Sequence, residues 1–102
     1  METLLPKCVY YSDADFKFEI QQIGNEIALH CEVYNWKPSI LRRGYSVLNT
    51  LIKESTEKDI SKLFTITPNP KFAKLLGGKS IAELHHNGKE YEVVIWDLKP
   101  QQ

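Results

Sequence analysis

Residues 41–46, Leu-Arg-Arg-Gly-Tyr-Ser, combine positive charge, a glycine and a small polar side chain at the start of a stretch with helical periodicity. Unpaired N–H groups at a helix N-terminus, together with the positive end of the helix dipole, favour an anion. Glycine also lets the backbone approach such a group closely. The segment therefore indicates a loop that holds a phosphate. A second interpretation stays open: if Pro38 and Ser39 open the helix, Gly44 lies inside it and its amide is used in an intrahelical hydrogen bond.

Two other groupings of reactive side chains are weaker. His85 and His86 are adjacent on an expected strand, so they point to opposite faces and do not readily chelate one metal ion. Cys31 has a histidine and a glutamate as neighbours, but adjacent strand residues face apart, so a catalytic pair would need a histidine from elsewhere. We predict no metal site, and we interpret Cys8 and Cys31 as buried free thiols.

The elements that must position these side chains follow from the spacing of the apolar residues. Alternation predicts a hairpin of two half-buried strands over 16–22 and 26–34, preceded by a further strand over 7–12. An apolar stripe of helical period covers 40–52. The β-branched and aromatic run 63–67 predicts another strand.

The last third of the chain predicts a short helix and a closing hairpin. The helix covers 71–78, after a proline that suits the first helical turn and with two glycines at its end. Strands over 79–86 and 91–98 flank Asn87-Gly88, the strongest short-range hairpin signal in the chain. The order is therefore β-β-β-α-β-α-β-β, an α/β fold with a mixed sheet of about six strands and two main helices. Two helices leave one face of such a sheet short of cover, which favours a dimer or a bound partner.

This order and its motifs resemble the GNAT superfamily of acyl-CoA-dependent N-acyltransferases. The resemblance covers about residues 16–98 and rests on the strand 26–33, the helix-opening segment 41–46 and the run 69–78. Its most specific part is the family motif [Q/R]-x-x-G-x-[G/A], in which backbone amides hold the pyrophosphate of coenzyme A. Gly44 matches the central glycine, whereas a leucine replaces the polar first residue and a serine the small last one.

The resemblance implies acetyl-CoA as cosubstrate and an amine as acceptor. The residues that it implies for the coenzyme are Arg42, Arg43, Gly44, Tyr45, Ser46 and Asn69. Glu26 matches best the glutamate that takes the amine proton in the family, and Glu32 and His30 are alternatives. A strand N–H near Val33 is implied to meet the oxyanion.

Three departures from the family favour a different function, and the first is Leu41 in place of the polar residue that opens the motif. Family members carry a tyrosine on the helix after the position of Asn69, as general acid toward the leaving thiolate; here Leu75-Leu76-Gly77-Gly78 ends that helix and no tyrosine stands on it. The family's first strand and its two N-terminal helices have no room before residue 16. The alternative is a GNAT-fold binding or structural protein without catalysis, similar to small bacteriophage-encoded proteins and acting on a host or virion protein.

The totals fit one globular domain over residues 1–102. Of the 102 residues, 42% are hydrophobic and 25% charged, which is ordinary for a globular chain. Thirteen basic and thirteen acidic residues cancel, so net charge gives no general attraction to nucleic acid or membranes. No secretory leader and no membrane span is predicted, so we expect a cytoplasmic protein. Of the two tryptophans, Trp36, in a loop, is the better candidate for a contact residue, and local packing is the alternative.

Overall fold

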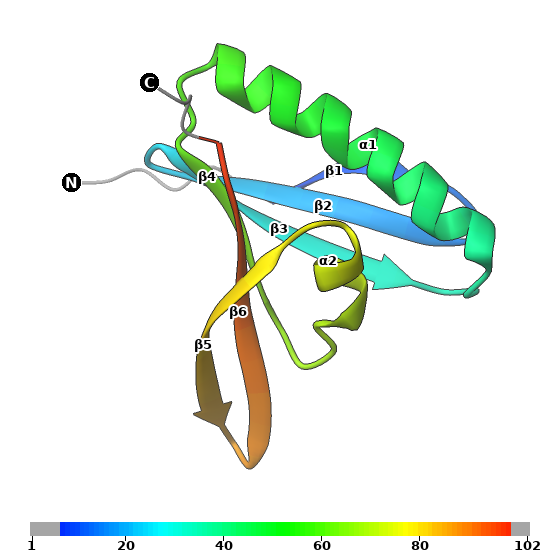
Figure 1. The fold of residues 1–102 in the computed structure, drawn as a ribbon, viewed down its shortest axis with the longest axis vertical. Helices are drawn as coiled ribbons and strands as arrows, with labels where there is room; N and C mark the ends of the chain where they lie inside the picture. The colour runs from blue at the N-terminus through cyan, green and yellow to red at the C-terminus, as the bar shows by residue number, and fades with distance from the viewer. Residues whose placement is uncertain (1–6, 99–102) are drawn as a thin grey trace.

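The computed structural model describes residues 7–98 and contains a mixed six-stranded sheet with both helices on one face (Figure 1). The elements are β1 (Cys8–Ser12), β2 (Phe16–Ile23), β3 (Glu26–Val33), α1 (Pro38–Glu57), β4 (Lys62–Thr67), α2 (Lys71–Leu75), β5 (Lys79–His86) and β6 (Lys89–Asp97). This confirms the predicted order. Residues 1–6 and 99–102 lie outside the described residues, so the single domain over 1–102 and the lack of a leader stay predictions. None of the described helices is both long enough and apolar enough to cross a membrane.

The sheet consists of two halves that meet at one short parallel pairing. Its strand order is β1-β2-β3-β4-β6-β5, and every pairing except that of β3 with β4 is antiparallel. The parallel pair needs a long crossover, which α1 supplies. It has three register pairs, and the last of them joins Ala28 to Phe64. Beyond that point β3 continues to Val33 and β4 to Thr67, and the two halves diverge (Figure 1).

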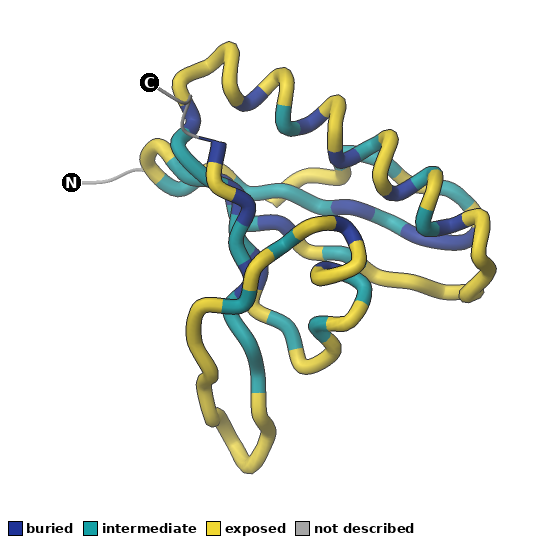
Figure 2. Tube along the Cα trace, viewed as in Figure 1, coloured by how far each residue is buried: buried dark blue, intermediate teal, exposed yellow. Residues whose placement is uncertain are grey.

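The core lies between α1 and one face of the sheet. The buried residues of α1 recur at helical spacing, so they form one stripe: Ile40, Gly44, Leu48, Leu51 and Ser55. Fully buried side chains of the sheet, such as Phe16, Phe18, Leu63 and Val94, belong to the same core. Figure 2 shows this stripe as the dark segments of α1 that face the strands. Burial of each large apolar side chain contributes about 1.5–3 kcal/mol, which makes this layer the main source of stability.

The opposite face of the sheet has no helix over it within residues 7–98 (Figure 1). Side chains alternate along a strand, so the neighbours of the core residues on β4 and β6 project to this face. They are apolar and not buried: Ile66 is 48% exposed, and the other three, Phe64, Val93 and Ile95, are partly buried. We call these four residues the open-face patch. The expectation that one face lacks cover is confirmed for the part of the chain described.

The closing hairpin extends away from the body of the molecule (Figures 1 and 2). Its turn is formed by Asn87 and Gly88, both with positive φ (51° and 77°), as a two-residue turn between antiparallel strands requires. The predicted turn is therefore confirmed. Residues 81–86 of β5 are all exposed, so most of this strand adds little to the core.

Gly78 lets α2 and β6 approach closely. A Cβ at this position would overlap Val94 and lie 3.0 Å from both the Ala73 carbonyl oxygen and Trp96. At Gly44, in contrast, a Cβ would meet the Phe72 ring at 3.1 Å, and that ring is only half-buried and can shift.

We expect Gly78→Ala to lower the free energy of unfolding by about 1–3 kcal/mol, because overpacking forces backbone shifts. Gly44→Ala is the matched control. Its helix-propensity gain of up to about 1 kcal/mol offsets the tight ring contact, so the net change should stay within about 1 kcal/mol. Urea denaturation followed by circular dichroism measures both, and equal losses in the two variants would contradict this account.

Candidate functional site

A cavity of about 740 Å³ lies where β3 and β4 part. Both strands and α2 line it, through residues that include Leu29, His30, Glu32, Thr65, Asn69 and Phe72. We call it the β3–β4 cleft. Because the strands diverge after Ala28 and Phe64, their inner edges carry peptide groups that the sheet no longer pairs.

The hydrogen bonds of Phe16 show which way the peptide groups of β3 point. The Phe16 N–H donates to Asp13 Oδ1 at 3.0 Å, and its carbonyl accepts from the Asp13 N–H at 3.0 Å, so both groups face away from β3. In an antiparallel pair the partner then directs its own groups away as well. That partner is Val33, and Cys31 shares its orientation. Two N–H donors of β3 therefore point into the cleft.

The predicted phosphate loop is part of a helix. Since α1 begins at Pro38, all of residues 41–46 lie inside it, and the first backbone bond already joins the Ile40 N–H to the Lys37 carbonyl at 2.9 Å. Proline is pre-organised for the first turn, which explains the early start. The amides of 43–46 are thus within the helical hydrogen-bond ladder, and the second interpretation of this segment describes the structure. Gly44 is buried and lets α2 approach through Phe72.

Arg43, expected to meet an anion, is instead held by two carboxylates of the chain. Its Nη1 lies 2.6 Å from Asp13 Oδ2 and its Nη2 lies 2.6 Å from Asp15 Oδ2. The guanidinium also lies over the Phe16 ring, 5.5 Å from the centroid. Lys37 adds a weaker contact to Asp15, at 3.4 Å. The hydrogen bond from Arg43 is the main reason that the pKa of Asp15 is lowered.

The other residues implied for the coenzyme do not all line the cleft. Arg42, Tyr45 and Ser46 are exposed on α1, and they are not among the residues that line the cleft. Asn69 does line it. Of the residues implied for the coenzyme, Asn69 alone therefore lines the cleft, and coenzyme binding by this set stays a prediction.

The candidate bases divide in the same way. Glu26 pairs with Lys62 at the end of β3 that is joined to β4, which we call the closed end. It lies about 23 Å along the strand from Val33. The two alternatives, His30 and Glu32, line the cleft. Of the three candidates, His30 and Glu32 therefore border the cavity, whereas Glu26 lies at the other end of the strand.

Cys31 also borders the cleft, but it is not poised as a nucleophile. Burial raises its pKa to about 12, so the thiol stays protonated at neutral pH. The expectation of two buried thiols is wrong for Cys8, which is exposed, because it lies on the edge strand β1.

Sequence reasoning missed two features of the site. Glu19 lies opposite His30 in the β2–β3 register, and Lys17 lies opposite Glu32. The turn expected after the first strand could have given this register, because a two-residue hairpin fixes every pairing above it. The parting of β3 and β4 had no such local signal.

Trp36 lines the cleft and packs edge-on against Phe72, with ring centroids 5.7 Å apart, and remains 56% exposed.

Comparison with known proteins places this geometry in a fold family. No protein-family model and no curated protein sequence matches the chain. Among solved structures, aminoglycoside 6'-acetyltransferase type Ii superposes with a TM-score of 0.72 at 16% identity, over 94% of this chain and 72% of that one. This chain has the GNAT fold.

Two further structures with the GNAT fold agree less closely. A protein described as a probable acetyltransferase from Staphylococcus epidermidis gives a TM-score of 0.60 at 15% identity, over 81% of this chain and 60% of that one. A spermidine N-acetyltransferase chimera of Vibrio cholerae SpeG and hSSAT gives 0.51 at 12% identity, over 84% and 69%. Identities this low establish the fold alone.

We expect Arg43→Met to lower the melting temperature at pH 7, because it removes the guanidinium that binds both Asp13 and Asp15. The contribution of this ion pair should be present above the unfolded pKa of aspartate, about 3.9, and should be lost as the pH falls through the lowered pKa of Asp15. The difference between wild type and variant should therefore shrink below about pH 4. Thermal denaturation between pH 7 and pH 2.5 measures it, with Arg42→Met as the exposed control. A difference that does not depend on pH would contradict the electrostatic explanation.

Proposed function

We propose that the β3–β4 cleft binds the pantetheine arm and thioester of acetyl-CoA, and that the protein transfers the acetyl group to a primary amine. The observation that carries the proposal is the parting of β3 from β4, with the N–H groups of Cys31 and Val33 directed into the cavity. An extended, amide-containing chain can add to such a free strand edge through main-chain hydrogen bonds. The GNAT fold, shared with an aminoglycoside 6'-acetyltransferase, supports acetyl transfer as the reaction.

In the proposed reaction the amine attacks the thioester carbonyl carbon directly. The carbonyl oxygen becomes an oxyanion that accepts a hydrogen bond from the Val33 N–H, and the carbon–sulfur bond then breaks to release the coenzyme thiolate. Glu32 or His30 takes the proton that the amine loses, since both line the cleft. The thiolate is protonated by solvent. This assignment replaces Glu26, which lies at the closed end of the strand.

The pyrophosphate of the coenzyme is better placed beside the exposed polar residues of the cleft than at the start of α1. The amides of 43–46 are used within the helix, and Arg43 is neutralised. Lys71, in contrast, is exposed and lines the cleft beside Asn69. We therefore propose Lys71 and Asn69 as the residues that meet the polar part of the coenzyme.

A second candidate function is binding without catalysis. It is favoured by the neutralised Arg43, by the short α2, which carries no tyrosine, and by the uncovered open-face patch. In this proposal a cytoplasmic protein of the kind encoded by bacteriophages uses the open-face patch to pair with a second copy or with a host or virion protein. The two candidates differ in whether acetyl-CoA binds.

We expect acetyl-CoA to bind with a micromolar dissociation constant and to shift the amide resonances of Cys31 and Val33 more than those of residues 43–46. Calorimetry and ¹H–¹⁵N correlation spectra measure this. Thr67→Trp places an indole in the cleft and should abolish binding, whereas Thr50→Trp, on the exposed side of α1, should not. No heat and no shifts at millimolar acetyl-CoA would overturn the proposal and leave the binding function.

If the transfer reaction occurs, its proton acceptor can be identified separately. We expect Glu32→Gln or His30→Gln to lower kcat by about 10²–10⁴-fold, the usual contribution of general base catalysis. Glu26→Gln should stay near wild type. Release of the coenzyme thiol with a panel of primary amines measures the rates. A loss confined to Glu26→Gln would contradict the assignment.

A further inference from the structure

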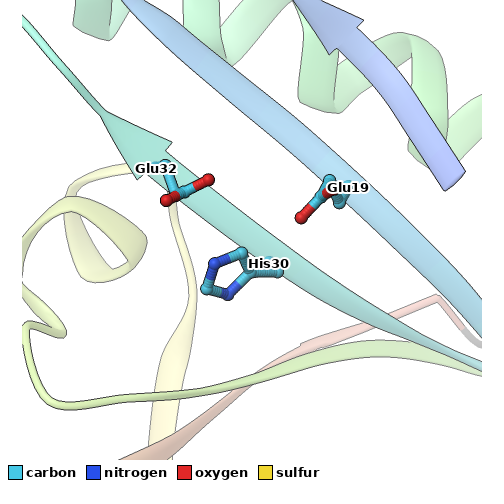
Figure 3. A group of neighbouring side chains, drawn as sticks. All are labelled: Glu19, His30 and Glu32. Atoms are coloured by element: carbon cyan, nitrogen blue, oxygen red, sulfur yellow. The ribbon is translucent and has the colours of Figure 1, made fainter. Parts of the chain in front are cut away.

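Three side chains that can bind a metal ion converge on the face of β2 and β3 away from α1 (Figure 3). They are Glu19 of β2 and His30 and Glu32 of β3. Glu19 and His30 are direct partners in the strand register, and Glu32 is two residues further along the same face. One ligand atom from each lies within 4.8 Å of the other two.

We infer that Glu19, His30 and Glu32 form a binding site for a divalent transition-metal ion, with zinc the best-fitting ion. One imidazole nitrogen and two carboxylate oxygens make a donor set that suits zinc and neighbouring first-row metals. Calcium and magnesium prefer a larger set made of oxygen alone, so the histidine argues against them.

The paired strands hold these side chains close to the separations that a zinc ion requires. A tetrahedral zinc ion with bonds of about 2.0–2.1 Å separates its ligand atoms by about 3.3 Å. Atoms up to 4.8 Å apart must therefore move inward by at most about 1.5 Å. His30 and Glu32 are exposed, so rotation of their side-chain torsions can supply this movement without disturbing the paired strands.

The cluster already holds a cation of the chain itself. Lys17 Nζ lies 3.1 Å from Glu32 Oε1 and 3.6 Å from Glu19 Oε2. Partly exposed ion pairs of this kind contribute little free energy, so a divalent ion can displace the ammonium. Lys17 is thus a competitor whose removal should tighten metal binding about three- to tenfold.

Metal binding at this site would affect the cleft. His30 and Glu32 also line it, and a bound ion would occupy both groups proposed to accept the amine proton. Zinc would then inhibit transfer. This consequence rests on the proposed function, but the metal site itself does not, and its test is carried out without acetyl-CoA.

The test is zinc titration by calorimetry on the full chain, with His30 followed by NMR. All proteins carry Cys8→Ser, because the exposed thiol could bind zinc by itself. We expect one ion per chain, about three- to tenfold tighter binding by Lys17→Met, and at least tenfold weaker binding by His30→Gln. His86→Gln is the matched control, an exposed histidine on β5, and should bind like the parent protein. Circular dichroism verifies that each variant is folded.

Three results would overturn the proposal. One is binding that persists in His30→Gln, and another is binding that is lost in His86→Gln, which would move the ion to the hairpin. The third is absence of binding by the parent protein at millimolar zinc, whether or not Lys17→Met binds, because Lys17 would then be the resident cation of the cluster.

Discussion

The short parallel pairing between β3 and β4 is the constraint on which the rest of the molecule depends. Three register pairs join two antiparallel half-sheets, and α1 packs across them on one face. Because the pairing ends at Ala28 and Phe64, the strands can diverge while their closed ends stay fixed. The cleft and the N–H groups directed into it follow from this geometry.

The early start of α1 determines which groups of the chain are available to bind an anion. Pro38 begins the helix six residues before Gly44, so the helix uses amides that a loop would have left free. Arg43 then projects toward the β1–β2 turn, where Asp13 and Asp15 bind it. Arg43 therefore forms ion pairs that join α1 to the edge of the sheet and does not attract an anion. The cation that lines the cleft is Lys71.

Local patterns predicted the elements well, and distant contacts poorly. Alternation and the Asn87-Gly88 turn gave the hairpins, and the apolar stripe gave α1, because each signal lies within one element. The role of Gly44 depended on where the helix begins, and both starting points fitted the sequence. The pairing of Arg43 with Asp13 joins residues far apart in the chain, and no periodicity reports such a contact. The site was therefore harder to predict than the fold.

The exposed β5–β6 hairpin gives the molecule two regions that differ in their resistance to local unfolding. Residues 81–86 contribute no buried side chain, whereas Val94 and Trp96, further along β6, belong to the core. Opening of the hairpin tip therefore breaks hydrogen bonds without exposing the core, and such local opening requires much less free energy than global unfolding. Amide protons near the tip will exchange with solvent through this opening. Those beside Val94 will exchange only when the whole sheet unfolds. One strand, β6, thus belongs to two cooperative units.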